Sequence, residues 1–248
     1  MTLDCENIDT CIASLSEILV IHSHTIIKTL IEIDLEEICS KRDNNDTPDV
    51  FLLNYFRETH NAATAFTSSF WFHNTRVKKG ADFKEGILPL NLMEIEITKF
   101  IDSLAKSIKP KKNKSLKNNS NSCYHFFTKI NDKTHWGPYA YLVRQTAINS
   151  PSISHDYLKI PEIVEDYIGC KYQNIREQLE EIYFEETISC IVKFEYLNNN
   201  EGLLGKALYY IYLTLRGEEL DFNSNTCHDG QAEIIKPESI CKIEYFLR

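Results

Sequence analysis

The sequence of 248 residues lacks the long apolar runs and glycine-rich loops that identify several large protein classes. No apolar stretch approaches the roughly 20 residues that a membrane-spanning helix needs. No basic region precedes an apolar one near the first residue, so we expect a cytoplasmic protein without a membrane span. The phosphate-cradling loops Gly-x-Gly-x-x-Gly and Gly-x-x-x-x-Gly-Lys are absent, as is the Gly-x-Ser-x-Gly turn of many hydrolases. These absences exclude the common nucleotide-binding loops and argue against serine hydrolysis.

Cysteine and histidine never occur at the spacing of a known metal site. The eight cysteines include no Cys-x-x-Cys pair, and the short-range His and Cys pairs do not repeat as zinc ligands do. We therefore expect no bound metal and no disulfide scaffold. Most of the cysteines lie among apolar residues, which predicts reduced thiols in the core of a cytoplasmic protein.

The overall charge of −9 disfavours binding to nucleic acid and to anionic membranes. Contact with nucleic acid would need a local basic patch, and residues 109–122 are the candidate because they are rich in Lys, Asn and Ser. Such a segment buries little apolar area and is predicted to be a mobile loop. A solvated loop is the favoured interpretation, and a contact with phosphates remains the alternative.

The spacing of apolar residues predicts both helices and strands. Helical spacing covers residues 8–40, 49–64, 91–108 and 161–186, with a polar break at 42–48 and a short helix ending near Gly86. Strands are predicted at residues 66–77, 188–197, 231–236 and 240–247. Residues 203–215 fit either a helix or a buried strand, and residues 217–230 form a polar loop.

The most informative segment is an aromatic strand that ends in polar residues, at positions 70–76. His73 and Thr75 would project from the same face of this strand, so they are able to contact one ligand, such as the two hydroxyls of a ribose. Arg76 is a candidate partner for a carboxylate or a phosphate. The alternative is a histidine bonded to backbone beside an ordinary surface arginine, and on the chemistry alone it is favoured.

Two further segments supply candidate site residues. Glu233 begins the predicted strand 231–236 after a polar loop, where a carboxylate is able to bond a ribose hydroxyl. An exposed position on an alternating strand is the commoner explanation of such a residue. Tyr139 and Tyr141 offer aromatic faces to a flat heterocycle, although core packing is the commoner role of a tyrosine.

Taken together, residues 72–76, 83–90 and 231–235 resemble the ADP-ribosyltransferase superfamily. The resemblance is to branches whose first motif is a His with a Ser or Thr two positions later. These are the poly-ADP-ribose polymerases, the diphtheria-type toxins and the DNA-modifying toxins of toxin–antitoxin and phage-defence systems. It implies an α+β fold with a mixed or antiparallel split sheet of short strands flanked by helices. Residues 66–248 would form this domain, and residues 1–65 a helical N-terminal segment packed on it.

The resemblance also implies roles and partners. His73, supported by Thr75, would bind a ribose hydroxyl of NAD, and the backbone at Asn74 would hold the nicotinamide amide, although the family often has Gly there. Tyr139 or Tyr141 would stack on the nicotinamide. Glu233 would stabilise the transition state as nicotinamide leaves, and Arg76 would steer a phosphate or the acceptor.

The acceptor would be a macromolecule, either protein or nucleic acid, and an antitoxin or another protein is an implied partner. Two alternatives stay open. One is a catalytically inactive member of the fold that binds a nucleotide or nucleic acid. The other is a helical module that docks a protein through residues 8–64.

Overall fold

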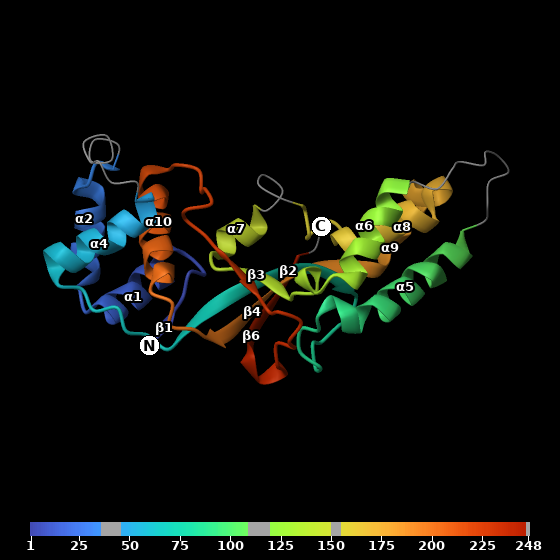
Figure 1. Ribbon diagram of the computed structural model, residues 1–248, viewed down its shortest axis with the longest axis horizontal. Coiled ribbons are helices and arrows are strands. Elements are labelled where there is room, and N and C mark those ends of the chain that lie inside the picture. The colour runs from blue at the N-terminus through green and yellow to red at the C-terminus, as the bar shows by residue number, and fades with distance from the viewer. Residues whose placement is uncertain (36–45, 109–119, 150–154, 247–248) are drawn as a thin grey trace. The chain divides into compact units, whose positions relative to one another are not determined.

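The structure is a computed structural model that describes residues 1–35, 46–108, 120–149 and 155–246 (Figure 1). Within these residues the protein is α+β, as predicted, with helices beside a six-stranded sheet. The strands are β1 (Thr2–Leu3), β2 (Ser68–Lys78), β3 (Tyr139–Tyr141), β4 (Thr187–Leu197), β5 (Cys227–Asp229) and β6 (Ile240–Phe246). Their order is β5-β3-β2-β4-β6, and β1 pairs with β2 in parallel while β3 pairs with β2 in the antiparallel sense.

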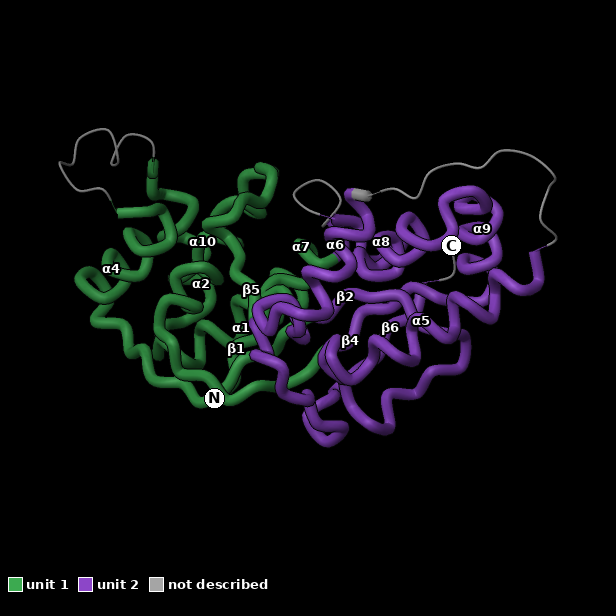
Figure 2. Tube along the Cα trace, turned by 45° about the vertical axis from the view of Figure 1, so that its right-hand side comes forward, with its two compact units in different colours: residues 1–72, 140–147, 193–228 green, residues 73–139, 148–192, 229–248 purple. Residues whose placement is uncertain are grey.

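The chain divides into two compact units that interleave in sequence (Figure 2). Unit 1 consists of residues 1–72, 140–147 and 193–228, and unit 2 of residues 73–139, 148–192 and 229–248. The sequence predicts one boundary, between residues 65 and 66, after the N-terminal helices. The boundaries in the structure instead fall inside strands, for example after Phe72 in β2 and after Val192 in β4.

The described part of unit 1 contains helices and the strand segments that accompany them. The helices are α1 (Ile8–Leu19), α2 (Ser23–Glu32), α4 (Pro48–His60) and α10 (Gly202–Arg216), with the short α7 (Arg144–Ile148). Helix α10 packs on α4 at Gly205, where a Cβ atom would lie 2.5 Å from the carbonyl oxygen of Asp49. The segment 203–215, which the sequence left open, is therefore a helix, and its glycine permits the close approach.

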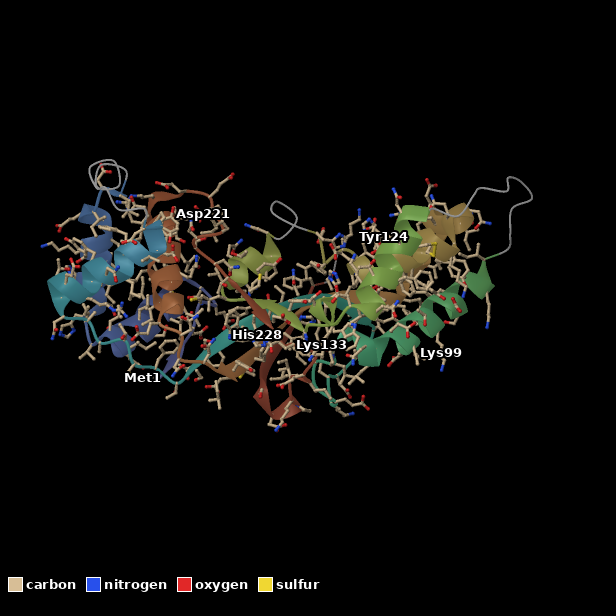
Figure 3. All side chains as sticks on the ribbon, in the orientation of Figure 1. Met1, Lys99, Tyr124, Lys133, Asp221 and His228 are labelled. Carbon is tan, nitrogen blue, oxygen red and sulfur yellow. A yellow bond between two sulfur atoms is a disulfide. The ribbon has the colours of Figure 1, made fainter. Side chains whose placement is uncertain are left out.

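Lys193 and His228 are among the buried polar residues of unit 1. The Nζ atom of the buried Lys193 lies 2.7 Å from Asp4 and 2.8 Å from Glu6, so the N-terminal segment is tied to β4 by partly buried ion pairs. The ring of His228, labelled in Figure 3, packs 5.3 Å from that of Trp71 and 4.4 Å from that of Tyr196. Lys193 and His228 are therefore polar side chains buried among apolar neighbours.

Unit 2 places helices α5 (Leu90–Ser107), α6 (Ser120–Asn131), α8 (Glu162–Lys171) and α9 (Arg176–Glu186) around an apolar core of their own. Ile101 of α5, Phe126 of α6 and Ile168 of α8 are buried in it. Short 3-10 turns lie at Lys133–His135, Gln173–Ile175 and Pro237–Ser239. The predicted helix over 161–186 is in fact two helices separated by the second of these turns. The break lets Leu179 and Tyr183 of α9 reach the core that α8 already lines, and this tertiary burial outweighs helix propensity.

Three other predictions are corrected. The expected helix at 82–86 is a turn, because Phe83 and Gly86 have φ of 53° and 85°, outside the helical region. The expected strand at 231–236 is also a turn, and only Ile235 forms a bridge, to Ile87. Within the expected loop 109–122, residues 109–119 lie outside the described residues, and the remainder begins α6.

The cysteines also differ from the expectation of reduced thiols. Cys123 of α6 and Cys170 of α8 form a disulfide, whereas Cys5, Cys11 and Cys190 are buried free thiols as predicted. The sequence separation of 47 residues gave no hint of this pairing.

Among the described residues, no single helix has the length and apolar composition needed to cross a membrane. The pair α1 and α2 would meet that test only when taken together, across a bend of 106°.

Candidate functional site

His73 lies on β2 in unit 2 with a half-buried ring held by backbone. Its Nδ1 atom is 2.7 Å from the carbonyl oxygen of Tyr139. Because a carbonyl only accepts hydrogen bonds, Nδ1 carries the proton and Nε2 is left with a lone pair. Burial lowers the pKa of His73, against the smaller opposing effect of the bond to Tyr139. The ring is therefore a neutral imidazole at neutral pH and presents an acceptor to any hydroxyl that approaches Nε2.

Tyr139 begins β3 and presents a partly exposed ring. Its side chain is 40% exposed and its hydroxyl donates to the carbonyl of Thr134. Burial, and then the charge of Asp229, raise the pKa of Tyr139, so it is a neutral phenol. The same residue thus fixes His73 through its carbonyl and offers an aromatic face through its side chain.

Glu233 is presented by a turn in which the backbone N–H groups of residues 230–233 are all hydrogen-bonded. Gly230 N donates to Pro138 O at 2.9 Å, and Ala232 N donates to Gly137 O at 2.8 Å. Gln231 N donates to the Asp229 carboxylate at 2.9 Å, and Glu233 N closes the turn on Gly230 O at 2.8 Å. The exposed carboxylate of Glu233 therefore projects from a rigid backbone even though its side chain is in solvent.

The same turn contains backbone strain. Gln231 and Ala232 both have left-handed φ, of 51° and 69°. Each such conformation costs a non-glycine residue of the order of 1–3 kcal/mol, and strain of this kind concentrates at functional sites. Nothing in the local sequence favours it, since neither residue is Gly or Asn. The strain is held in place by the hydrogen bonds to residues 137 and 138.

Segment 137–139 connects His73 with the turn that carries Glu233. Tyr139 binds the imidazole on one side, and its two predecessors bind the turn on the other. Tyr139 stands on β3, between β2 and β5 in the sheet. We refer to His73, Tyr139 and the turn that carries Glu233, which residues 137–139 join within unit 2, as the Glu233 cluster.

The predicted segment 83–90 borders this cluster as well. Gly86 adopts φ of 85°, and a Cβ atom there would lie 2.1 Å from the carbonyl oxygen of Ile235. Ile87 and Ile235 exchange backbone hydrogen bonds of 2.9 and 3.1 Å. Only glycine fits at position 86, and its presence lets the segment close against the chain that leaves Glu233.

Asn74, Thr75 and Tyr141 were also predicted to belong to the site. Asn74 is buried, while Thr75 is half-buried like His73, as expected for two residues on the same face of a strand. Tyr141 belongs to unit 1, where it pairs with Phe72, so it is not part of the cluster.

Arg76 is occupied by structural contacts. Its guanidinium donates to the hydroxyls of Thr187 and Ser189 at 2.6 and 2.7 Å. It also donates to the carbonyls of Leu158, Phe184 and Thr187 at 3.2, 3.0 and 3.3 Å. These bonds join β2 to the start of β4 and to the end of α9. The expected role in binding a phosphate or an acceptor is therefore replaced by a role in holding the strands.

Sequence reasoning missed Asp229, which accepts the hydrogen bond of Gln231 and lies close enough to Tyr139 to affect its pKa. The Asp-Gly pair at 229–230 is a turn signal that could have identified it.

Two further properties define the surroundings of the cluster. Among the described residues, no group of three or more His, Cys, Asp or Glu side chains is arranged to hold a metal ion. A pocket of about 360 Å³ lies elsewhere in unit 2, and none of the predicted site residues lines it.

No protein-family model, curated protein or solved structure matches this chain.

Proposed function

We propose that this protein is a cytoplasmic NAD-dependent ADP-ribosyltransferase, a toxin or defence effector that cleaves the bond between nicotinamide and ribose and transfers ADP-ribose to a protein or nucleic acid. The observation that carries the proposal is the strained, hydrogen-bonded turn before Glu233, which binds the same segment, residues 137–139, that also binds His73. A carboxylate on a hydrogen-bonded turn and a neutral imidazole, both attached through residues 137–139, are the groups that recognition of a ribose needs.

The chemistry follows from the charges. As nicotinamide leaves, positive charge develops on the ribose ring, and a fixed carboxylate nearby stabilises that charge. Glu233 supplies the carboxylate. The neutral His73 accepts a hydrogen bond from a ribose hydroxyl at Nε2, because its proton is already committed to Tyr139. The exposed ring of Tyr139 provides a stacking face for the nicotinamide.

The test is nicotinamide release and label transfer from NAD that carries a labelled adenylate. Glu233→Gln removes the charge and keeps the shape, and we expect the rate to fall by about 10²–10³-fold, the usual effect of losing one transition-state stabiliser. His73→Ala is expected to weaken both NAD binding and turnover. Glu238→Gln is the matched control, since Glu238 is exposed and only pairs weakly with Lys236 at 4.0 Å.

The outcomes separate the candidate functions. Loss of release in Glu233→Gln but not in Glu238→Gln supports catalysis. Binding of NAD without release by the wild-type protein supports the inactive, nucleotide-binding alternative. Absence of both binding and release, over a range of macromolecular acceptors, would end the proposal.

A further inference from the structure

The disulfide between Cys123 and Cys170 joins two helices of unit 2 at a point of unusually close approach. The Cα atoms of the two residues are 4.5 Å apart. Gly169, the neighbour of Cys170, faces α6 so closely that a Cβ atom there would lie 2.5 Å from Ser122 Oγ. The missing side chain of Gly169 is what allows α6 and α8 to come near enough for the bond.

The two helices have other reasons to stay together. The rings of Phe126 and Tyr167 pack with centroids 5.0 Å apart in the unit 2 core. Lys129 of α6 forms ion pairs with Asp166 at 2.6 Å and with Glu162 at 3.2 Å, both on α8. Because an apolar core and paired charges already hold α6 on α8, the disulfide is not required to assemble this helix pair.

The bond is also reachable from one side. The pocket of about 360 Å³ is lined by Cys170 but not by Cys123. Its remaining lining comes from α5, α6 and α8: Glu94, Thr98, Phe126, Phe127, Tyr167 and Lys171. Both cysteines are half-buried, and Tyr124, next to Cys123, is 69% exposed and is labelled in Figure 3. A small molecule that enters the pocket therefore contacts Cys170 and not Cys123.

We infer that the Cys123–Cys170 pair is a reversible thiol–disulfide exchange site for a small thiol of the glutathione class, attacked at Cys170 from the pocket. The proposal stands apart from the proposed enzymatic function, since none of the residues of the Glu233 cluster lines the pocket.

The exchange balances as follows. The thiolate of the small molecule attacks Sγ of Cys170 and forms a mixed disulfide there. The bond to Cys123 breaks, and its electron pair leaves on Sγ of Cys123, which then takes a proton from water. A second small thiolate then attacks the sulfur of the bound small molecule and forms the oxidised dimer. The bond to Cys170 breaks, and its electron pair leaves on Sγ of Cys170, which takes a proton from water, so that two small thiols are oxidised while the protein disulfide is reduced.

The positions of the two sulfurs favour this direction. Cys123 lies near the N-terminus of α6, which begins at Ser120, and Cys170 lies near the C-terminus of α8, which ends at Lys171. A helix N-terminus stabilises an anion and a C-terminus disfavours one. Cys123 is therefore the better leaving thiolate, and Cys170 is the sulfur that keeps the adduct.

The experiment uses the full chain with Cys227→Ser and Cys241→Ser, which remove the two exposed free thiols. The protein is incubated with reduced glutathione, quenched by alkylation, and mapped by peptide mass spectrometry. We expect native reduction, with the glutathione adduct on Cys170. In the same background, the single variants are incubated with oxidised glutathione, which forms the mixed disulfide and releases one glutathione thiol. Cys123→Ser is expected to hold a stable adduct at Cys170, and Cys170→Ser to form adducts at Cys123 at least about tenfold more slowly, because Cys123 does not line the pocket.

Three results would overturn the inference. The first is reduction only after the protein is unfolded, which would make the bond structural. The second is equal modification of the two cysteines in the single variants. The third is the finding that Cys123 and Cys170 are both free thiols in protein kept in air. Circular dichroism of the double variant Cys123→Ser/Cys170→Ser checks that α6 and α8 persist without the bond, and loss of its helical signal would count against the argument.

Discussion

Replacing Arg76 tests whether the polar end of β2 holds the strands together or binds a ligand. The structure gives its guanidinium five hydrogen bonds, to groups on residues 158, 184, 187 and 189. Thr187, Ser189 and Leu158 are buried, so their oxygens would lose a partner without gaining water. We therefore expect Arg76→Met to lower the free energy of unfolding strongly.

The magnitude follows from the number of bonds. A net contribution of about 0.5–1.5 kcal/mol for each bond, with incomplete additivity, gives about 3–5 kcal/mol for the whole side chain. Total stability of a protein domain is about 5–15 kcal/mol, so the loss would be a large fraction of it. At about 2–4 °C for each kcal/mol, the melting temperature should fall by about 10 °C.

Urea denaturation and thermal melting followed by circular dichroism provide the assay. Arg76→Lys keeps the charge but loses the planar fork, so it should recover less than half of the stability. Arg57→Met is the control, since Arg57 pairs with Glu201 at a partly exposed site and should cost less than about 1 kcal/mol. Wild-type stability in Arg76→Met, combined with a loss of NAD binding, would refute the reasoning and restore the ligand-binding role.

Further predictions concern the disulfide, the imidazole and the turn. Cys123→Ser/Cys170→Ser should stay folded but lose about 4 kcal/mol in denaturant titrations, the loop-entropy value for a separation of 47 residues; a loss near zero would contradict it. Because burial lowers the pKa of His73, the unfolded chain binds the proton more tightly. Its contribution to stability is therefore complete above about pH 6.5 and is lost as the pH falls from there through the lowered folded-state pKa. His73→Gln should flatten this slope in urea titrations over that range, and an unchanged slope would exclude His73 as its source. Asp229→Ala removes the acceptor for Gln231 N, so NAD turnover should fall about tenfold with little change in melting temperature. Asp229→Asn keeps an acceptor oxygen and should keep the wild-type rate of turnover. Equal rates in the two variants would show that the turn does not depend on this bond.

Much of the fold was accessible from sequence because periodicity reports burial. The strand over residues 188–197 and the helix over 91–108 each have a regular apolar pattern, and the structure places β4 and α5 there. The split of 161–186 was not accessible, since the turn depends on which core the later apolar residues join. Local pattern carries no information about such distant partners.

Only some of the candidate site residues could be predicted from the sequence. The sequence identifies His73 and Thr75 because they are polar and lie on the same face of one strand. It could not predict that Arg76 bonds to carbonyls 82 to 111 residues away, because these contacts form only in the folded chain. Glu233 was found as the start of a strand and is instead carried by a strained turn. Consecutive left-handed residues that are neither Gly nor Asn contradict local propensity, so the hydrogen bonds that the turn forms with Asp229 and with residues 137 and 138 explain them.

The interleaving of the two units has a consequence for biosynthesis. Helices α1, α2 and α4 leave the ribosome early, yet their packing partner α10 begins only at Gly202. At about 5–20 residues per second, the apolar faces of these first helices wait on the order of ten seconds for their cover. Nascent chains of this protein should therefore be bound by chaperones until translation passes residue 216, and truncated chains that end before α10 should aggregate.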